Sequence, residues 1–155
     1  MRLSPQGKFF LRRPHRDDMT RGSNSPQALT ELDVGFLIKQ TAETIAVGIH
    51  FARAMGCLTE ETSLAFAFKW TKLKNRKLSC WANHEKLWLS LGNLQNYSAH
   101  QDEFTKFVNI PLDTPLSALS NYVEQVVHPL FEVFNGFNVR KDIIEDMTRD
   151  LIERK

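Results

Sequence analysis

The stretch Phe66–Trp81 reads FAFKWTKLKNRKLSCW and decides the fold that we predict for this chain. It begins inside an alternation of large and small side chains that runs from Thr62 to Trp70. The large side chains on one side of this alternation are Leu64, Phe66, Phe68 and Trp70. A period of two is typical of a strand with one buried face. We therefore predict a strand over Thr62–Trp70 that presents its aromatic side chains to the core.

The second half of the stretch predicts a hairpin. Lys74 and Asn75 can form a two-residue turn, because Asn tolerates a positive φ. With that turn, Phe68 faces Trp81, and a second strand covers about Arg76–Ala82. The interpretation places Trp81 on the same buried face as Phe68 and leaves the tip of the hairpin in solvent.

The remaining chain predicts helices and one further strand. Apolar residues at steps of three and four predict a helix over about Leu32–Met55, with a box-like N-terminus at Thr30 and Asp33 and a stop at Gly56. Gly48 lies in the middle of this helix and indicates close packing against another element. The other predicted elements are a strand over Phe104–Leu112, a helix that starts at Pro115 behind Thr114 and is kinked or split at Pro129, and a last helix over Val139–Arg154.

These elements predict an α+β fold. We expect a small antiparallel sheet, made of the hairpin and one or two further strands, with three main helices packed on one face. Residues 1–30 are expected to form an N-terminal arm or edge strand, in which residues 7–13 are the strand candidate. Residues 31–155 then form a single domain, which we interpret as the C-terminal module of a larger protein.

Composition limits the classes of function. The chain has 155 residues, 42% of them hydrophobic and 25% charged, as in ordinary globular domains. Its formal net charge of +2 gives no general attraction to nucleic acid, so a basic site would have to be local. The two cysteines, Cys57 and Cys80, form no CxxC pattern and are expected to be reduced thiols of a cytoplasmic protein. No apolar stretch is long enough to span a membrane.

Cations form the most definite candidate site. The predicted hairpin carries Lys69, Lys72, Lys74, Arg76 and Lys77, and the arm adds Arg12 and Arg13, with Lys8 and Arg16 beside them. A basic β-ribbon can follow phosphates, and we expect any contact with DNA or RNA to be weak, indifferent to sequence and sensitive to salt. The alternative is that these lysines only protect an edge strand from pairing with other chains.

Two clusters combine a histidine with carboxylates. They are His15-Arg-Asp-Asp18 and His100-Gln-Asp-Glu103, and neither has the spacing of a known zinc motif. Because nucleophile and phosphate-loop motifs are also absent from the sequence, we predict no catalytic residue, no metal and no cofactor. Two alternatives remain open. One is a small metal-dependent enzyme that brings the two clusters together, and the other is a structural oligomerisation module whose terminal helix pairs between chains.

Several phrases together resemble a known family. They are FFLRR and DD within residues 9–18, AETIAVG at 42–48, FKWTKLKNRKLSCW at 68–81, HQDE at 100–103, IPLDTPLSAL at 110–119 and PLFEVFNGF at 129–137. They are similar to the C-terminal region of bacterial DNA-binding or ATP-binding proteins that carry an AlbA-like N-terminal domain and are related to the Schlafen group. The resemblance implies a non-catalytic regulatory or sensing domain and an AlbA-like domain as its partner. It implies no catalytic residue here, because nucleic-acid binding in that family belongs to the AlbA-like domain.

Overall fold

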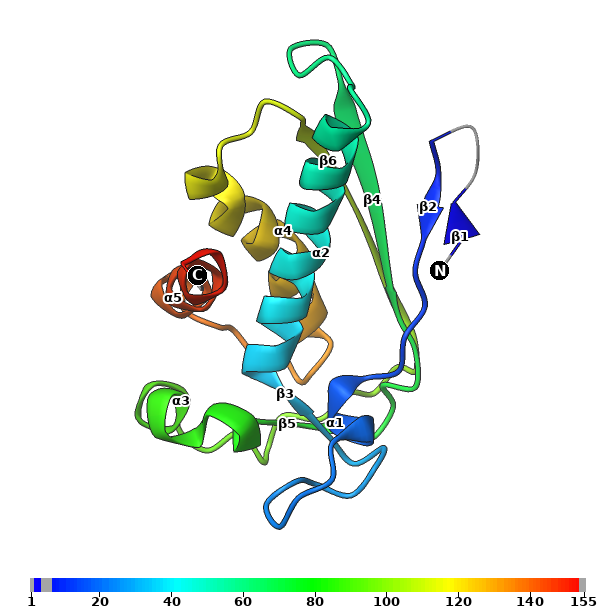
Figure 1. Cartoon of the computed structure of the whole chain (residues 1–155). Coiled ribbons are helices and arrows are strands. Elements are labelled where there is room, and N and C mark those ends of the chain that lie inside the picture. The colour runs from blue at the N-terminus through cyan, green and yellow to red at the C-terminus, as the bar shows by residue number, and fades with distance from the viewer. Residues whose placement is uncertain (1, 4–6, 154–155) are drawn as a thin grey trace.

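The computed structural model has the α+β fold that the sequence predicts (Figure 1), and it describes residues 2, 3 and 7–153. The side chains of residues 2, 3 and 83–86 are not described. The strands are β1 (Arg2–Leu3), β2 (Phe9–Phe10), β3 (Glu31–Asp33), β4 (Ser63–Trp70), β5 (Lys77–Ser79) and β6 (Phe104–Pro111). The helices are α1 (Arg16–Met19), α2 (Val34–Ala54), α3 (His84–Leu91), α4 (Leu119–Glu132) and α5 (Lys141–Ile152).

Helix α2 is the central helix, and its ends follow the sequence signals. The side chain of Asp33 caps it by accepting from the N–H of Phe36, and Gly56 follows it with φ of 77°. The expected close packing at Gly48 is confirmed, because a Cβ at this position would lie 2.6 Å from Cε1 of Phe66. In Figure 1, α2 lies between β4 on one side and α4 and α5 on the other.

The predicted hairpin is wrong. Strand β4 pairs antiparallel with β6, so that Trp70 lies opposite Phe104, whereas β5 pairs in parallel with β3. A turn does form at Lys74 and Asn75, since the N–H of Arg76 donates to the carbonyl of Leu73 at 3.0 Å, but it does not pair β4 with β5. Leu73 is fully buried, and its N–H donates to the carbonyl of Asp102 at 2.9 Å. The described sheets are therefore three separate strand pairs, in place of one small antiparallel sheet built on a hairpin.

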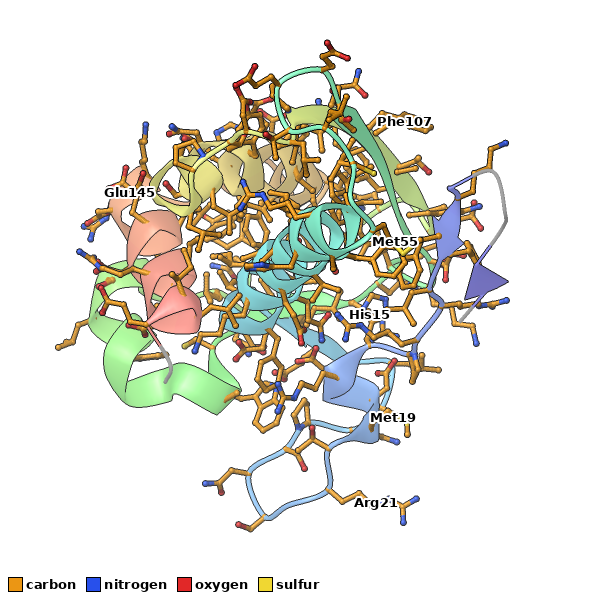
Figure 2. The ribbon with its side chains drawn as sticks, turned by 45° about the horizontal axis from the view of Figure 1, so that its top comes forward. His15, Met19, Arg21, Met55, Phe107 and Glu145 are labelled. Carbon is orange, nitrogen blue, oxygen red and sulfur yellow. The ribbon has the colours of Figure 1, made fainter. Side chains whose placement is uncertain are left out.

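The alternation along β4 is confirmed, although its aromatic side chains are half-buried and not fully buried. Phe66, Phe68 and Trp70 stack in a row on the inner face, with ring centroids 6.1 and 5.7 Å apart. Trp81 does not join this face, because its ring packs edge-on against Phe36 at the start of α2, with centroids 5.6 Å apart. Phe107, on the outer face of β6, is 72% exposed and points away from the molecule (Figure 2).

The C-terminal helices complete the core. The segment behind Pro115 is a 3₁₀ turn, Leu116–Ala118. Helix α4 then continues through Pro129 as one helix, so of the kink or split predicted there the split does not occur. Asn135 and Gly136 follow with positive φ, as expected at a helix end. The apolar residues of α5, such as Ile144 and Met147, are buried within the chain against α2 and α4. The exposed side of α5 is charged, so the described part of this helix offers little apolar surface to a second chain.

Several short elements were not predicted. Strands β1 and β3 are two of them, and β3 includes residues where the central helix was expected to begin. Helix α3 lies in the segment after Trp81, where the sequence shows no clear period, and α1 lies inside the predicted arm. Residues 9 and 10 of the arm form β2, which pairs with β1, and the ring of Phe9 lies 6.1 Å from that of Phe51 on α2. None of the described helices is both long and apolar enough to cross a membrane.

Candidate nucleic-acid interface

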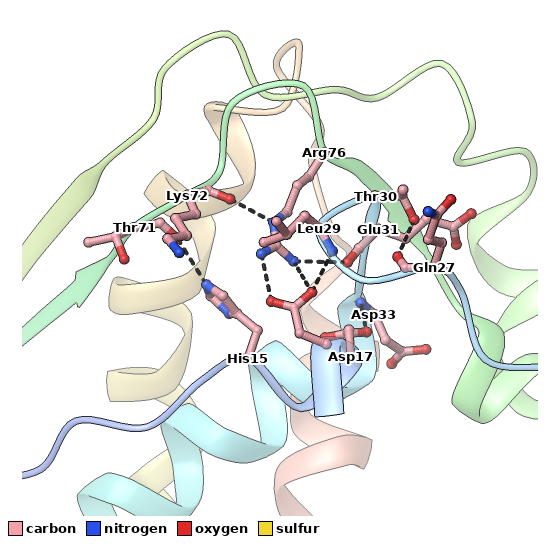
Figure 3. A network of polar contacts seen from close by, with 11 residues as sticks. His15, Asp17, Gln27, Leu29, Thr30, Glu31, Asp33, Thr71, Lys72 and Arg76 are labelled. Atoms are coloured by element: carbon pink, nitrogen blue, oxygen red, sulfur yellow. Dashed lines mark hydrogen bonds and ion pairs between the residues drawn. The ribbon is translucent and has the colours of Figure 1, made fainter. Parts of the chain in front are cut away.

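A buried ion pair lies at the centre of the region where the sequence places the site (Figure 3). The guanidinium of Arg76 donates to both carboxylate oxygens of Asp18, at 2.8 and 2.7 Å, and its Nε donates to the carbonyl of Lys72 at 2.6 Å. Arg76 is only 1% exposed. The prediction that Arg76 stands at a solvent-exposed tip is therefore wrong, and its charge is committed to Asp18.

Asp17 makes a second buried connection between the arm and the domain. Its Oδ1 accepts from the N–H of Asp33 at 2.8 Å and from Nε1 of Trp81 at 2.9 Å. Asp33 in turn accepts from the N–H of Ala82 at 2.9 Å. These bonds fix the indole of Trp81 and the start of α2 to the same carboxylate.

His15 forms the third connection. Its Nε2 lies 3.1 Å from the carbonyl of Thr71, and since a carbonyl oxygen only accepts, Nε2 is the donor. Burial lowers the pKa of His15, the bond to Thr71 raises it in part, and the nearby charge of Arg76 adds to the lowering. For Asp18, burial alone would raise the pKa, but the bonds from Arg76 and from the N–H of Leu29 outweigh burial and lower it.

The loop that carries the candidate lysines is held at several points of its backbone. Besides the Leu73 bond, Asn75 donates to the carbonyl of Ala99 at 2.8 Å, and Lys77 donates to the carbonyl of Thr30 at 3.0 Å. The side chains of Lys72, Lys74 and Lys77 are exposed, and none forms an ion pair within the described part of the chain. The loop therefore presents three uncompensated cations on a fixed backbone.

The other predicted cations differ in their partners. Lys69 pairs with Glu103 at 2.7 Å, and Arg13 pairs with Glu43 at 3.3 Å, in both cases at the surface. Arg16 lies over the ring of Phe36, 4.7 Å from its centroid. Arg12 and Lys8 are exposed. Four of the predicted cations are therefore exposed and form no ion pair among the described residues, and they lie in two segments that touch: Arg12, Lys72, Lys74 and Lys77. The segments touch at His15, three residues after Arg12, which contacts Thr71, the residue before Lys72.

The two histidine–carboxylate clusters have different partners. His15 and its neighbours make the contacts described above, whereas His100 hydrogen-bonds Asn135. Among the side chains that the structure describes, which leave out residues 83–86, no group of three or more His, Cys, Asp or Glu is placed to hold a metal ion. Both cysteines are free thiols, and burial, with a smaller contribution from the charge of Asp33, raises the pKa of Cys80.

Comparison with known proteins adds no relative. No protein-family model matches the chain, and neither the curated proteins nor the solved structures yield a match.

Sequence reasoning missed the structural role of Asp17, Asp18 and Trp81. The sequence groups the two carboxylates with His15 as ligand candidates, because adjacent acids in a turn-rich segment give the same pattern in both roles. Their partners lie at least 11 residues away in the sequence, at Leu29, Asp33, Arg76 and Trp81, so no local pattern separates the two roles.

Proposed function

We propose that this chain is a non-catalytic binding module that contacts nucleic acid through the exposed cations of the arm and the loop, Arg12, Lys72, Lys74 and Lys77. The observation that supports the proposal is the fixed loop, in which Lys72 and Lys74 flank the buried Leu73 and carry no ion pair in the described structure. Cations on a fixed backbone lose little conformational freedom when they meet phosphates.

The chemistry of this surface suits phosphate contact without readout of sequence. Lysine is a flexible point charge, and the one arginine of the predicted hairpin is already bound by Asp18. If all four cations neutralise phosphates of a single strand, affinity should fall about 50-fold between about 50 and about 200 mM salt. The resemblance in sequence further suggests that the module serves a cytoplasmic bacterial protein beside an AlbA-like domain.

The test is a titration of labelled DNA and RNA, followed by fluorescence anisotropy at the two salt concentrations. The variant Lys72→Glu with Lys74→Glu should abolish binding at both concentrations. Its thermal melting should stay close to that of the wild type, because both side chains are exposed.

The matched control is Arg140→Glu with Lys141→Glu, which makes the same change of net charge at the start of α5. Negative charge is favourable at a helix N-terminus, so this control should remain folded and should retain most of the binding. Absence of binding by the wild type at low salt would disprove the proposed function and leave the lysines as edge protection. Equal loss in the control would show that net charge, and not the loop, is responsible.

A further inference from the structure

A cavity of about 390 Å³ opens beside the proposed cation surface. Its lining residues come from β3, from β5 and the residues after it, from α3 and from the segment after α3. Figure 1 shows β3, β5 and α3 at the same end of the molecule. The side chains that matter for its chemistry are Glu31, Ser79, Cys80, Trp81, Trp88 and Gln95. Its size is within the range of sites for small molecules.

Two indole rings, of Trp81 and Trp88, line the cavity and provide aromatic surface for stacking. Trp81 is held by the bond from its Nε1 to Asp17 and by the ring of Phe36, so its orientation is fixed before any ligand arrives. Trp88 comes from α3 and remains 47% exposed. Indoles can stack on any nucleobase, because every nucleobase has a π face.

The cavity also holds an unsatisfied polar group. Ser79 is 6% exposed, and its Oγ has no hydrogen-bond partner in the described structure. A buried hydroxyl without a partner is unfavourable, and a ligand whose polar edge meets the Oγ after a rotation about χ1 of Ser79 would relieve it. Cys80 contributes a soft, neutral wall, since burial raises the pKa of its thiol and keeps it protonated.

The charges around the cavity favour an uncharged ring inside and a phosphate outside. Glu31 lines the cavity and disfavours an anion within it. Lys77, exposed and one of the four proposed phosphate contacts, is the β-pair partner of Glu31 and lies two residues before Ser79. Two residues along a strand span about 6–7 Å, a reach comparable to the distance between a base and its own phosphate.

We propose that this cavity binds a nucleobase, stacked on Trp81 and Trp88 with its polar edge toward Ser79, while Lys77 meets the adjoining phosphate. The inference rests on the proposed function and narrows its ligand to unpaired nucleic acid. A base inside a duplex cannot enter the cavity without being extruded, so a single strand should bind more tightly than the same sequence as a duplex.

The decisive variant is Ser79→Ala. A structural role for the hydroxyl predicts a lower melting temperature, whereas a binding role predicts weaker binding without a loss of stability. Removing an unpartnered buried hydroxyl should leave the melting temperature unchanged or raise it, whereas loss of the contact to the base should weaken binding of a single strand. The matched control is Thr148→Val, which removes the other unpartnered buried hydroxyl of the described structure, on α5. This control should leave binding unchanged.

Trp88→Ala supplies a second variant at a half-exposed position. It should weaken binding of a labelled single strand by about 5-fold or more and have little effect on the duplex. Tryptophan fluorescence with adenosine as probe shows whether the cavity accepts a free nucleoside or only a base within a nucleic-acid strand. Quenching that is lost in Trp88→Ala would show that a free nucleoside suffices, and quenching by the strand alone would show that the phosphate contacts are required.

Salt-sensitive binding that is equal for single strand and duplex, and unchanged in Ser79→Ala and Trp88→Ala, would overturn the nucleobase site and leave the proposed function intact. Failure of the wild type to bind any nucleic acid at low salt, with no quenching by adenosine, would overturn both.

Discussion

At the scale of single residues, the most informative position is Arg76. Its charge is almost completely removed from water, and it is compensated by a bidentate carboxylate and a backbone carbonyl. A buried pair of this kind adds little net stability compared with apolar residues, but removal of one partner leaves an uncompensated charge. Arg76 therefore ties the arm to the loop and makes the fold depend on Asp18.

The first prediction concerns this pair. Asp18→Asn should lower the free energy of unfolding by about 3 kcal/mol, because Arg76 stays buried without its counter-charge. Glu43→Gln breaks the exposed pair with Arg13 and should change the free energy of unfolding by less than about 1 kcal/mol. Urea unfolding of both variants measures the difference. Equal effects would show that Arg76 reaches water when Asp18 is neutralised.

The second prediction concerns pH and His15. Because its pKa is lowered in the folded protein, the unfolded chain binds more protons as the pH falls below the ordinary histidine value of about 6.5. The contribution of His15 to stability is therefore complete above that pH and is lost as the pH falls through the folded pKa. His15→Gln, which can still donate to Thr71, should flatten the dependence of stability on pH between about 7.5 and 5.5. An unchanged slope in urea unfolding across this range would contradict the assignment.

At the scale of elements, the contact between α2 and β4 determines how the central helix lies on the sheet. Gly48 allows the ring of Phe66 to approach the helix backbone, and Phe66 begins the row of stacked rings that ends at Phe104. The helix and the strand are each evident from their own periods. Their contact at Gly48 joins these two elements.

The third prediction tests this contact. Gly48→Ala should destabilise the protein by about 1–2 kcal/mol, because the clash with Phe66 outweighs the gain in helix propensity. Phe66→Leu, combined with Gly48→Ala, should recover part of the loss, since a shorter side chain leaves room for the Cβ. A double-mutant cycle by thermal melting measures the coupling. Additive effects would mean that Phe66 moves aside freely.

At the scale of the whole molecule, the N-terminal segment completes the domain. Asp17, Asp18 and His15 bond to the loop, to β3 and to the turn after β5, and all three lie within the predicted arm. By contrast, residues 7–14 pair with β1 through β2, and the contacts that the structure describes between them and the rest of the domain are the ring contact of Phe9 and the exposed pair of Arg13. The two parts of the arm should therefore differ in their importance for folding.

The fourth prediction compares two truncations. Removal of residues 1–14 should leave a cooperatively folded protein, because the contacts it deletes among the described residues are at the surface. Removal of residues 1–20 should abolish cooperative unfolding or lower the melting temperature severely, because Arg76 and Trp81 lose their buried carboxylates. Circular dichroism during heating distinguishes the two. Similar melting of both proteins would show that residues 21–155 fold without the contacts of His15, Asp17 and Asp18.

The sequence by itself determined the elements whose signals are local and long. The alternation along β4, the apolar stripe of α2, the strand β6 and the two C-terminal helices were all predicted with ends close to those observed. Each carries its period over two or more turns or several strand residues, so packing elsewhere does not alter it. Gly48 and Gly56 were likewise interpreted correctly, because glycine is favoured where another group approaches the backbone closely or where φ is positive.

Only the tertiary structure decided which strands pair and which cations are exposed. The turn at Lys74-Asn75 is compatible with a hairpin, and the positive φ of Asn75 was anticipated, but the burial of Leu73 draws the loop toward residues 99–102 and leaves β6 as the partner of β4. The burial of Arg76 depends on Asp18, 58 residues away. The alternation of side chains in a strand predicts which face is buried but not which strand pairs with it. A charged residue can be predicted as buried or exposed only when its partner is known. Both are set by contacts distant in sequence, and these determined the candidate site.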